Sequence, residues 1–430
     1  MEKIFNIAIA GLGTIGGGTL KLLQSNASLL KERCGVTLKV VAVLERDKGK
    51  QKILNLEGIH WASSVEELVG MKGLDLIVEL IGGSEGIAKT LVESALKAGK
   101  HVVTANKALI AHHGTELARI AEASGAMLAY EAAVAGGIPI IKSLREGLVA
   151  NDFKSIAGIM NGTCNFILTS MRDEHKEFDV ALAEAQRVGY AEADPSFDID
   201  GVDTAHKLAI MTSLAYGCPV NIGAVYVEGI RGISVLDMDF ADKLGYTIKL
   251  LGIAQRTEKG ILQRVHPCLV GKASALGRVS GVFNGVVVDG DPIGRITMEG
   301  RGAGEGPTAS SVVGDIADIA RGGIYKPFTV AADHLKPLPL ADIETLVSPY
   351  YVRLVVTDKP GVLAAITGIF RDQGISMRSF LQHSHAPGES VQVVMTTHET
   401  LEKGMRAALN AIGALDSVIE PPHMIRIENL

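Results

Sequence analysis

The sequence predicts an α/β protein in three parts: a doubly wound parallel sheet, a mixed α+β domain and a small C-terminal α+β domain. Three observations support this prediction. The chain has 430 residues, which is too long for one compact core. Its first third alternates short apolar runs with helical patterns, as chains that form parallel sheets do. A Pro-rich stretch at 336–340 marks a boundary, and a new β-α-β pattern begins at Tyr350.

The elements of the first third are predicted from the change between continuous apolar runs and helical periodicity. Helices alternate with these runs, so we expect helices on both faces of a parallel sheet. Buried strands are expected at 4–10, 38–44, 74–81, 101–104 and 127–130. Helices are expected at 15–25, 86–98 and 108–124.

The remainder of the chain is predicted to mix helices with antiparallel strands. Residues 301–311 should form a Gly-rich loop that leads into a helix at 312–320. Other elements before the Pro-rich stretch are helices at 180–188 and 204–216 and strands at 260–270 and 282–288. The C-terminal part should contain strands at 351–356 and 391–396, helices at 362–372 and 401–412, and one more strand after 374–377.

Composition excludes several functional classes. Aromatic residues make up 4% and the net charge is −6, so neither a stacking surface nor a basic stripe for nucleic acid is expected. The four cysteines are far apart, which predicts free thiols in a reducing compartment. Leu208–Val227 carries no charge, but Gly217 and Pro219 interrupt it, so we expect a buried helix followed by a turn. With no signal peptide pattern at the start, a cytoplasmic protein without membrane contact is predicted.

A glycine motif lies directly after the first predicted strand and opens the first predicted helix. In a Rossmann-type site the first glycine makes a tight turn, the second lets the backbone approach a pyrophosphate, and the third allows close packing of helix on strand. The motif predicts an NAD- or NADP-binding domain; the alternative is a glycine-rich turn without a ligand. Residues 11–16 match GxGxxG as Gly11, Leu12, Gly13, Thr14, Ile15 and Gly16.

The end of the second predicted strand carries charges that bear on the choice of cofactor. Glu45 could accept a hydrogen bond from the ribose 2′-hydroxyl of NAD, whereas Arg46 could pair with the 2′-phosphate of NADP. Arg46 favours NADP slightly, and use of both cofactors stays open. The alternative is a solvent-exposed turn of mixed charge.

An acidic segment near residue 200 is the most informative part of the chain. A helix is expected to begin near Val202, so Asp203 and Lys207 should share one of its faces. Carboxylates gathered around one lysine could bind an ammonium group and hold the lysine beside a reacting oxygen. The simpler interpretation is an acidic loop with an i,i+4 ion pair. The five carboxylates are Glu192, Asp194, Asp198, Asp200 and Asp203.

The order of the residues around these carboxylates resembles the signature of homoserine dehydrogenases. The matching runs are GYAEADP at 189–195 and DIDGVDTAHKL at 198–208. Further runs at 104–107, 130–140, 161–167 and 302–310 resemble family segments in the same order, so the resemblance covers about residues 1–340. Another amino-acid or semialdehyde reductase, and a catalytically inactive amino-acid sensor, are the alternatives.

The resemblance implies interconversion of L-aspartate 4-semialdehyde and L-homoserine with NAD(P)H, in the biosynthesis of threonine, methionine and isoleucine. Lys207 would donate the proton, with Lys107 assisting. Gly189, Glu192, Asp198 and Asp203 would hold the substrate. Besides the glycine motif, the cofactor would contact Arg46, Lys107 and Gly304. A monovalent cation, sodium, would bind the main-chain carbonyls of Glu131, Val134, Gly136 and Ile138.

The implied domains are a nucleotide-binding domain at 1–131, completed by about 305–340, and a catalytic and dimerisation domain at 132–304. Residues 350–370 resemble the opening of an ACT domain, which implies a ferredoxin-like regulatory domain at 348–430. Feedback control by an amino acid, with threonine the expected effector, would follow. A dimerisation module without a ligand is the alternative. The family resemblance also implies a homodimer or homotetramer.

Overall fold

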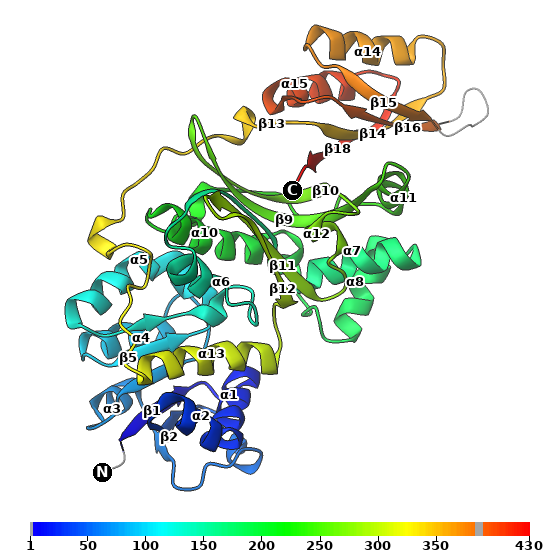
Figure 1. The fold of residues 1–430 in the computed structure, drawn as a ribbon. Helices are drawn as coiled ribbons and strands as arrows, with labels where there is room; N and C mark the ends of the chain where they lie inside the picture. Colours follow the sequence, from blue (N-terminus) through cyan, green and yellow to red (C-terminus); the bar gives the residue numbers. More distant parts are fainter. Residues whose placement is uncertain (1–2, 383–389) are drawn as a thin grey trace.

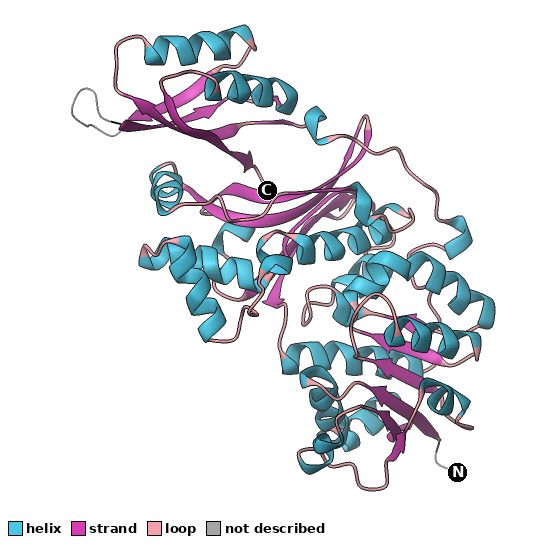
Figure 2. Ribbon diagram, turned by 180° about the vertical axis from the view of Figure 1, so that it is seen from behind, coloured by secondary structure: helices cyan, strands magenta, loops and turns pink. Residues whose placement is uncertain are grey.

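A computed structural model describes residues 3–382 and 390–430. The three parts follow one another along an elongated molecule, with the nucleotide-binding part at one end and the C-terminal part at the other (Figure 1). Seen from behind, helices flank the first sheet, whereas the middle sheet lies between its own helices and the C-terminal part (Figure 2).

The N-terminal part is built on a parallel sheet with the strand order β3-β2-β1-β4-β5-β6. This order is that of a doubly wound dinucleotide-binding sheet, as predicted. Its strands are β1 (Ile4–Ala10), β2 (Thr37–Leu44), β3 (His60–Ala62), β4 (Leu76–Glu79), β5 (His101–Thr104) and β6 (Leu128–Ala129).

Helices cover both faces of this sheet. One core contains Leu20 and Val312 from α1 and α13, and the other contains Leu91 and Leu117 from α4 and α5. Helix α13 therefore returns from far along the chain to complete the nucleotide-binding part. The helices are α1 (Thr14–Ser25), α2 (Ala27–Cys34), α3 (Val65–Gly70), α4 (Ile87–Lys97), α5 (Lys107–Ser124) and α13 (Glu305–Ala320).

The middle part packs helices against a mixed sheet. Helix α10 is buried along most of its length, because it lies between this sheet and α5. It ends at Tyr216 before Gly217, which confirms a buried helix followed by a turn. The strands are β7 (Asp152–Ile159), β8 (Val225–Val227), β9 (Tyr246–Thr257), β10 (Gly260–Gly271), β11 (Phe283–Asp291) and β12 (Gly294–Arg301). The helices are α6 (Ile140–Lys142), α7 (Gly162–Glu174), α8 (Phe178–Arg187), α9 (Ser196–Ile199), α10 (Val202–Tyr216), α11 (Val235–Lys243) and α12 (Ala275–Arg278).

The C-terminal part is a ferredoxin-like α+β unit with the strand order β18-β14-β16-β15. Strand β18 also pairs in parallel with β10, placing Arg426 opposite Cys268, so the middle and C-terminal sheets are continuous. Its elements are β13 (Val347–Ser348), β14 (Tyr350–Thr357), α14 (Val362–Asp372), β15 (Met377–Gln382), β16 (Ser390–Thr397), β17 (Thr400–Leu401), α15 (Glu402–Gly413) and β18 (Val418–Glu428).

The structure differs from the prediction at the start of α13 and in several elements that were not predicted. Helix α13 begins at Glu305, within the predicted Gly-rich loop, because Pro307 lies in its first turn, where the missing N–H has no helical partner to lose. The elements that were not predicted are strands β3, β7, β8, β9, β12, β13, β17 and β18 and helices α2, α3, α6, α7, α9, α11 and α12. Strand β9 is buried on both faces along most of its length, so its apolar run at 250–254 lacks the alternation that distinguishes a strand from a buried helix.

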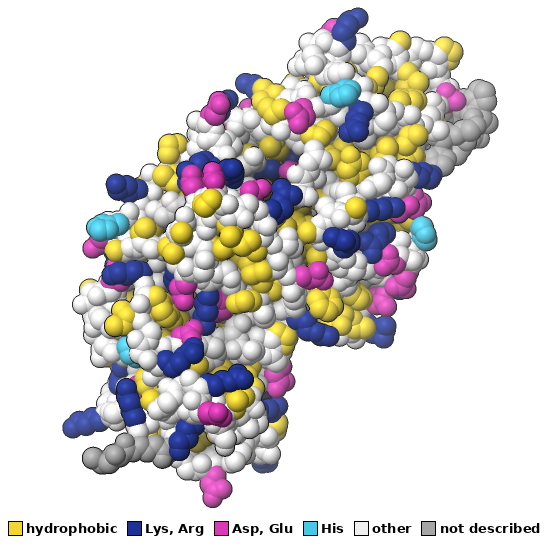
Figure 3. Space-filling view, viewed as in Figure 1, with side chains coloured by type: hydrophobic (Ala, Val, Ile, Leu, Met, Phe, Trp, Pro, Cys, Tyr) yellow, Lys and Arg dark blue, Asp and Glu magenta, His cyan; other side chains and the backbone are white. Residues whose placement is uncertain are grey.

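The surface in the view of Figure 3 carries basic and acidic side chains interspersed with apolar ones. Within the described residues, every helix is too short or too polar to cross a membrane.

Candidate active site

The glycine turn between β1 and α1 has the geometry that its sequence predicts. Gly11 has φ +90°, and a Cβ there would lie 2.5 Å from the Leu80 carbonyl oxygen. A Cβ at Gly16 would lie 1.8 Å from the carbonyl oxygen of Gly11, so the helix packs directly on the turn. Gly13, by contrast, faces open space. A bound pyrophosphate could therefore approach the backbone at Gly13, where the N-terminus of α1 favours negative charge.

A cavity of about 700 Å³ extends from this turn along the ends of β2 and β4. Glu45 and Arg46 both line it. The Glu45 carboxylate accepts backbone N–H groups of Leu12 at 2.6 Å, Arg46 at 2.7 Å and Asp47 at 3.0 Å. These bonds hold its pKa below the usual value, although burial acts in the opposite direction. Glu45 thus stabilises the glycine turn through its hydrogen bond from Leu12. The position of Glu45 in the sequence did not predict this role.

Asp203 joins two lysines that are 100 positions apart in the chain. Its Oδ1 lies 2.6 Å from Nζ of Lys107, and its Oδ2 lies 2.7 Å from Nζ of Lys207. Lys207 also donates to the carbonyl of Met160 at 2.7 Å. Asp203 and Lys207 lie one turn apart on α10, as their spacing predicts, while Lys107 is the first residue of α5.

Burial and neighbouring charges shift the pKa values of the two lysines in opposite directions. Burial lowers the pKa of Lys207, the Lys107 ammonium lowers it further, and Asp203 opposes both effects. Burial also acts to lower the pKa of Lys107, but Asp203 outweighs it and raises that pKa above the usual value. The two ammonium groups hold the pKa of Asp203 well below its usual range despite complete burial. Lys207 is therefore the lysine that releases its proton more readily.

Lys107 reaches the site from the end of strand β5. The side chain of Asn106 accepts the N–H of Leu109 at 3.0 Å and caps the start of α5. The ammonium of Lys107 also lies 5.4 Å from the ring centre of Phe197, at a cation–π distance. Because β1 and β5 are parallel, their carboxyl ends lie at the same edge of the sheet, so Lys107 and the glycine turn face the same side.

The other predicted substrate residues surround this centre at different depths. Asp198 is half-buried on α9, and burial together with Asp203 raises its pKa. Gly189 and Glu192 lie on the exposed loop between α8 and α9. In the described part of the chain, no hydrogen bond or ion pair is made by the Glu192 carboxylate, but its charge contributes to raising the pKa of Lys107.

Sequence reasoning missed Asn161 as a site residue. Its side-chain amide lies 2.7 Å from Oδ1 of Asp198 and 2.8 Å from Oδ2 of Asp203. The run NGTCNFI at 161–167 was noticed only as part of a family resemblance. Its position directly before a helix is a capping signal and does not indicate contact with residues some 40 positions away.

The four predicted cation-binding residues lie on one buried turn after β6. Ala135 and Gly136 have φ of 53° and 36°, so successive carbonyls point in different directions. The Gly136 carbonyl accepts the Ser311 hydroxyl at 2.5 Å, and that of Ile138 accepts the N–H of Ile140 at 2.8 Å. Each carbonyl oxygen has a second lone pair. The main-chain oxygens of Glu131, Val134, Gly136 and Ile138 are the type of ligand that a hard cation takes, and their existing hydrogen bonds leave a lone pair that such an ion could share.

Gly304 lies where α13 meets the nucleotide-binding part. It has φ +114° and directly precedes α13. Next to it, Glu305 pairs with Lys21 of α1 at 3.2 Å. The residues before Gly304 contact the turn at 131–138, since the N–H of Gly137 donates to the Arg301 carbonyl at 2.9 Å.

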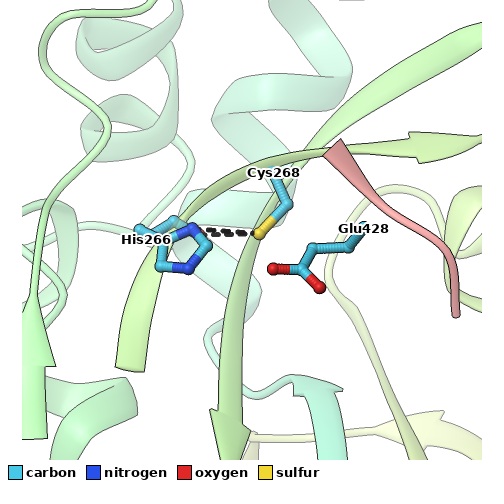
Figure 4. A group of neighbouring side chains, drawn as sticks. All are labelled: His266, Cys268 and Glu428. Carbon is cyan, nitrogen blue, oxygen red and sulfur yellow. Dashed lines mark hydrogen bonds between the residues drawn. The ribbon is translucent and has the colours of Figure 1, made fainter. Parts of the chain in front are cut away.

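A second cluster, His266, Cys268 and Glu428, lies between β10 and β18 (Figure 4). Nδ1 of His266 is 3.2 Å from Sγ of Cys268. Glu428, however, already binds the buried guanidinium of Arg264 at 3.0 and 3.2 Å. Burial lowers the pKa of His266, and the guanidinium groups of Arg426 and Arg264 lower it further. This positive surrounding disfavours a metal ion.

Comparisons with known proteins agree with this geometry. A family model described as homoserine dehydrogenase matches residues 139–317, its NAD-binding domain matches 11–131, and an ACT domain matches 350–417. A homoserine dehydrogenase of Neisseria gonorrhoeae is 43% identical, with 100% of this chain and 99% of the relative covered. The crystal structure of a homoserine dehydrogenase from Thiobacillus denitrificans superposes with a TM-score of 0.94 at 44% identity, covering 100% and 99%.

A hyperthermophilic archaeal homoserine dehydrogenase solved with NADPH matches with a TM-score of 0.65 at 29% identity, covering 75% of this chain and 99% of that chain. The family model and the relatives distinguish the chain from other reductases that share the nucleotide-binding fold. The chain belongs to the homoserine dehydrogenase family of NAD(P)-dependent oxidoreductases, with a C-terminal ACT domain.

Proposed function

We propose that Lys207 is the proton donor when aspartate semialdehyde is reduced to homoserine. The observation that carries this proposal is the pair of lysines bound to the Asp203 carboxylate: burial lowers the pKa of Lys207, whereas Asp203 raises that of Lys107. A buried ammonium near the aldehyde oxygen stabilises the alkoxide as charge develops and then transfers its proton.

The remaining residues bind and orient the substrate. When bound, the reduced nicotinamide supplies the hydride that the aldehyde carbon receives. The aldehyde oxygen takes a proton from Nζ of Lys207, and the neutral amine regains a proton from solvent after the product leaves. The Lys107 ammonium, held by Asp203, would assist by stabilising the negative charge that develops on the oxygen. Glu192 and Asp198 would bind the ammonium group of the substrate, with the backbone of Gly189 beside them.

The test is homoserine oxidation followed by the absorbance of reduced cofactor. The wild type should reduce NADP in the presence of homoserine, and Lys207→Ala should lower kcat at least a hundredfold, because general acid–base groups contribute about 10²–10⁴ in rate. Lys97→Ala, which removes an exposed lysine of α4, is the control and should keep wild-type activity. An active Lys207→Ala variant would show that another group transfers the proton.

We infer that NADP is preferred over NAD. The Glu45 carboxylate is already bonded to three backbone N–H groups, which disfavours its use as the acceptor for a 2′-hydroxyl. Arg46 lines the same cavity and could pair with a 2′-phosphate. The NADPH found in the archaeal relative is consistent with this inference.

Arg46→Ala should raise the KM for NADP about tenfold, as expected for loss of a charge-assisted contact of about 1.5 kcal/mol. The KM for NAD should change less than twofold. Arg33→Ala on α2, outside the cavity, should leave both constants unchanged. Equal losses for NAD and NADP would assign Arg46 a role other than contact with the 2′-phosphate.

Three further properties belong to this proposal. The carbonyls of Glu131, Val134, Gly136 and Ile138 would bind a monovalent cation, most readily sodium, which would stiffen the turn between the two domains. The ACT domain would bind an amino-acid effector, with threonine expected as a product of the pathway. The chain would act in the cytoplasm as a homodimer or homotetramer.

A further inference from the structure

Asn161 lies at the centre of the carboxylates that surround the two lysines. It follows strand β7, directly precedes and caps helix α7, and is only 5% exposed. Its amide nitrogen donates to Oδ1 of Asp198 at 2.7 Å and to Oδ2 of Asp203 at 2.8 Å. The carbonyl of the preceding residue, Met160, accepts from Lys207. Met160 and Asn161, which are adjacent in the chain, thus contact Asp198, Asp203 and Lys207 between them.

The orientation of the amide follows from the helix that it caps. Its Oδ1 accepts the backbone N–H of Cys164 at 2.8 Å, and a backbone N–H can only donate. The oxygen must therefore face α7, so the NH₂ group must face Asp198 and Asp203. The cap itself uses only the oxygen, which leaves both N–H donors for the carboxylates.

These two N–H groups bear directly on the geometry of Asp203. Asp198 and Asp203 repel each other, and each raises the cost of ionising the other. A shared donor reduces this repulsion and holds Oδ2 of Asp203 toward Lys207, so that Oδ1 remains for Lys107. Without it, the Asp203 carboxylate could rotate and bind one lysine through both oxygens.

We propose that Asn161 is a positioning residue for proton transfer: its NH₂ group fixes Asp198 and Asp203 so that one oxygen of Asp203 serves each lysine. The proposal rests on Lys207 being the proton donor. It assigns no contact between Asn161 and the substrate. Its effect should therefore appear in kcat and in the ionisation of Lys207, and cofactor binding should be unaffected.

Two substitutions separate capping from positioning. Asn161→Ser keeps an oxygen that can cap α7 but has no NH₂ group, whereas Asn161→Ala loses both functions. We expect Asn161→Ser to keep a Tm close to that of the wild type, while both variants lower kcat for homoserine oxidation at least tenfold. The KM for NADP should stay within twofold of the wild type.

The pH dependence of kcat separates positioning from a purely structural role of Asn161, because loss of a helix cap alone would not change the pKa of Lys207. Loss of the N–H donors leaves Asp203 a stronger partner for the Lys207 ammonium, so the pKa of Lys207 should rise. The acid limb of kcat for homoserine oxidation should move to higher pH in Asn161→Ser.

If Asn161→Ser keeps the wild-type kcat and pH profile while Asn161→Ala does not, Asn161 is only a helix cap and the proposal is wrong. Loss of Tm and NADP binding in Asn161→Ser together with kcat would also overturn it. A wild-type enzyme that fails to oxidise homoserine, or a Lys207→Ala variant that retains activity, would instead refute the proposed function itself.

Discussion

Asp203 shows how one buried side chain can set the properties of two others. Its two oxygens bind Lys107 and Lys207 separately, and its own pKa stays low because both partners are cationic. Lys107 is about one-third exposed, whereas Lys207 is buried, so desolvation acts more fully on Lys207. The difference in burial therefore gives two chemically identical ammonium groups different pKa values.

At this scale we predict that Lys107→Met shifts the pH dependence of the reaction. Lys107 lowers the pKa of Lys207, so removing its charge should raise that pKa. Homoserine oxidation needs neutral Lys207, hence its acid limb should move to higher pH. Reduction of the semialdehyde needs protonated Lys207, hence its activity should persist to higher pH.

Initial rates over pH 6 to 11 in both directions measure these limbs. The conservative control is Lys97→Met, which removes an exposed charge on α4 that pairs with Glu93 and not with Asp203. A lowered rate with unshifted limbs would mean that Lys107 acts on the substrate or cofactor and not on Lys207.

At the scale of the elements, the glycine turn contains one glycine, Gly16, that leaves no space for a side chain and another, Gly13, that does. Gly16 has no room for a methyl group because the Gly11 carbonyl fills that space, whereas Gly13 has open space and φ −63°. The first position serves packing of α1 on β1, and the second serves the approach of the cofactor. Both are glycines in one motif, but only the structure separates their roles.

Gly13→Ala should therefore fold with a nearly unchanged Tm but raise the KM for NADP at least tenfold, because its methyl group would occupy the pyrophosphate position. Gly16→Ala should lose Tm strongly or fail to accumulate as folded protein. Thermal unfolding with and without NADP checks both variants. Wild-type NADP binding by Gly13→Ala would place the pyrophosphate elsewhere.

For the whole molecule, the joint between the middle and C-terminal parts is built around Arg426. Its fully buried guanidinium binds Glu228 at 2.7 and 3.1 Å and donates to Glu402 at 2.9 Å. The segment that carries Glu228 also reaches the active site, since the N–H of Ile230 donates to the Ile199 carbonyl of α9 at 2.8 Å. The ACT domain and the acidic substrate loop therefore share one connecting segment.

Arg426→Met should destabilise the protein strongly, because removing one partner of a buried ion pair costs about 3–5 kcal/mol. The KM for homoserine should rise more than the KM for NADP, since α9 carries Asp198 and the nucleotide site is distant along the fold. Arg371→Met, an exposed residue of α14, should leave Tm and both constants unchanged. Equal effects on both KM values would indicate general unfolding.

The sequence by itself determined those features that depend on neighbouring residues. The glycine turn, the i,i+4 placement of Asp203 and Lys207, and the start of α14 at Val362 follow from local backbone geometry, which the chemical character of each residue restricts. The runs that resemble homoserine dehydrogenase segments also pointed to the family, because so long a pattern in the right order is specific even without coordinates.

Only the tertiary structure decided which distant segments meet. It brought Lys107 and Asn161 to Asp203, turned Glu45 toward the glycine turn, and paired β18 with β10. These contacts depend on how sheets and helices pack, and residue type and spacing leave many such packings open. Long-range pairing is fixed by burial of the whole core, so the chemistry at Asp203 exists only once all three segments have folded together.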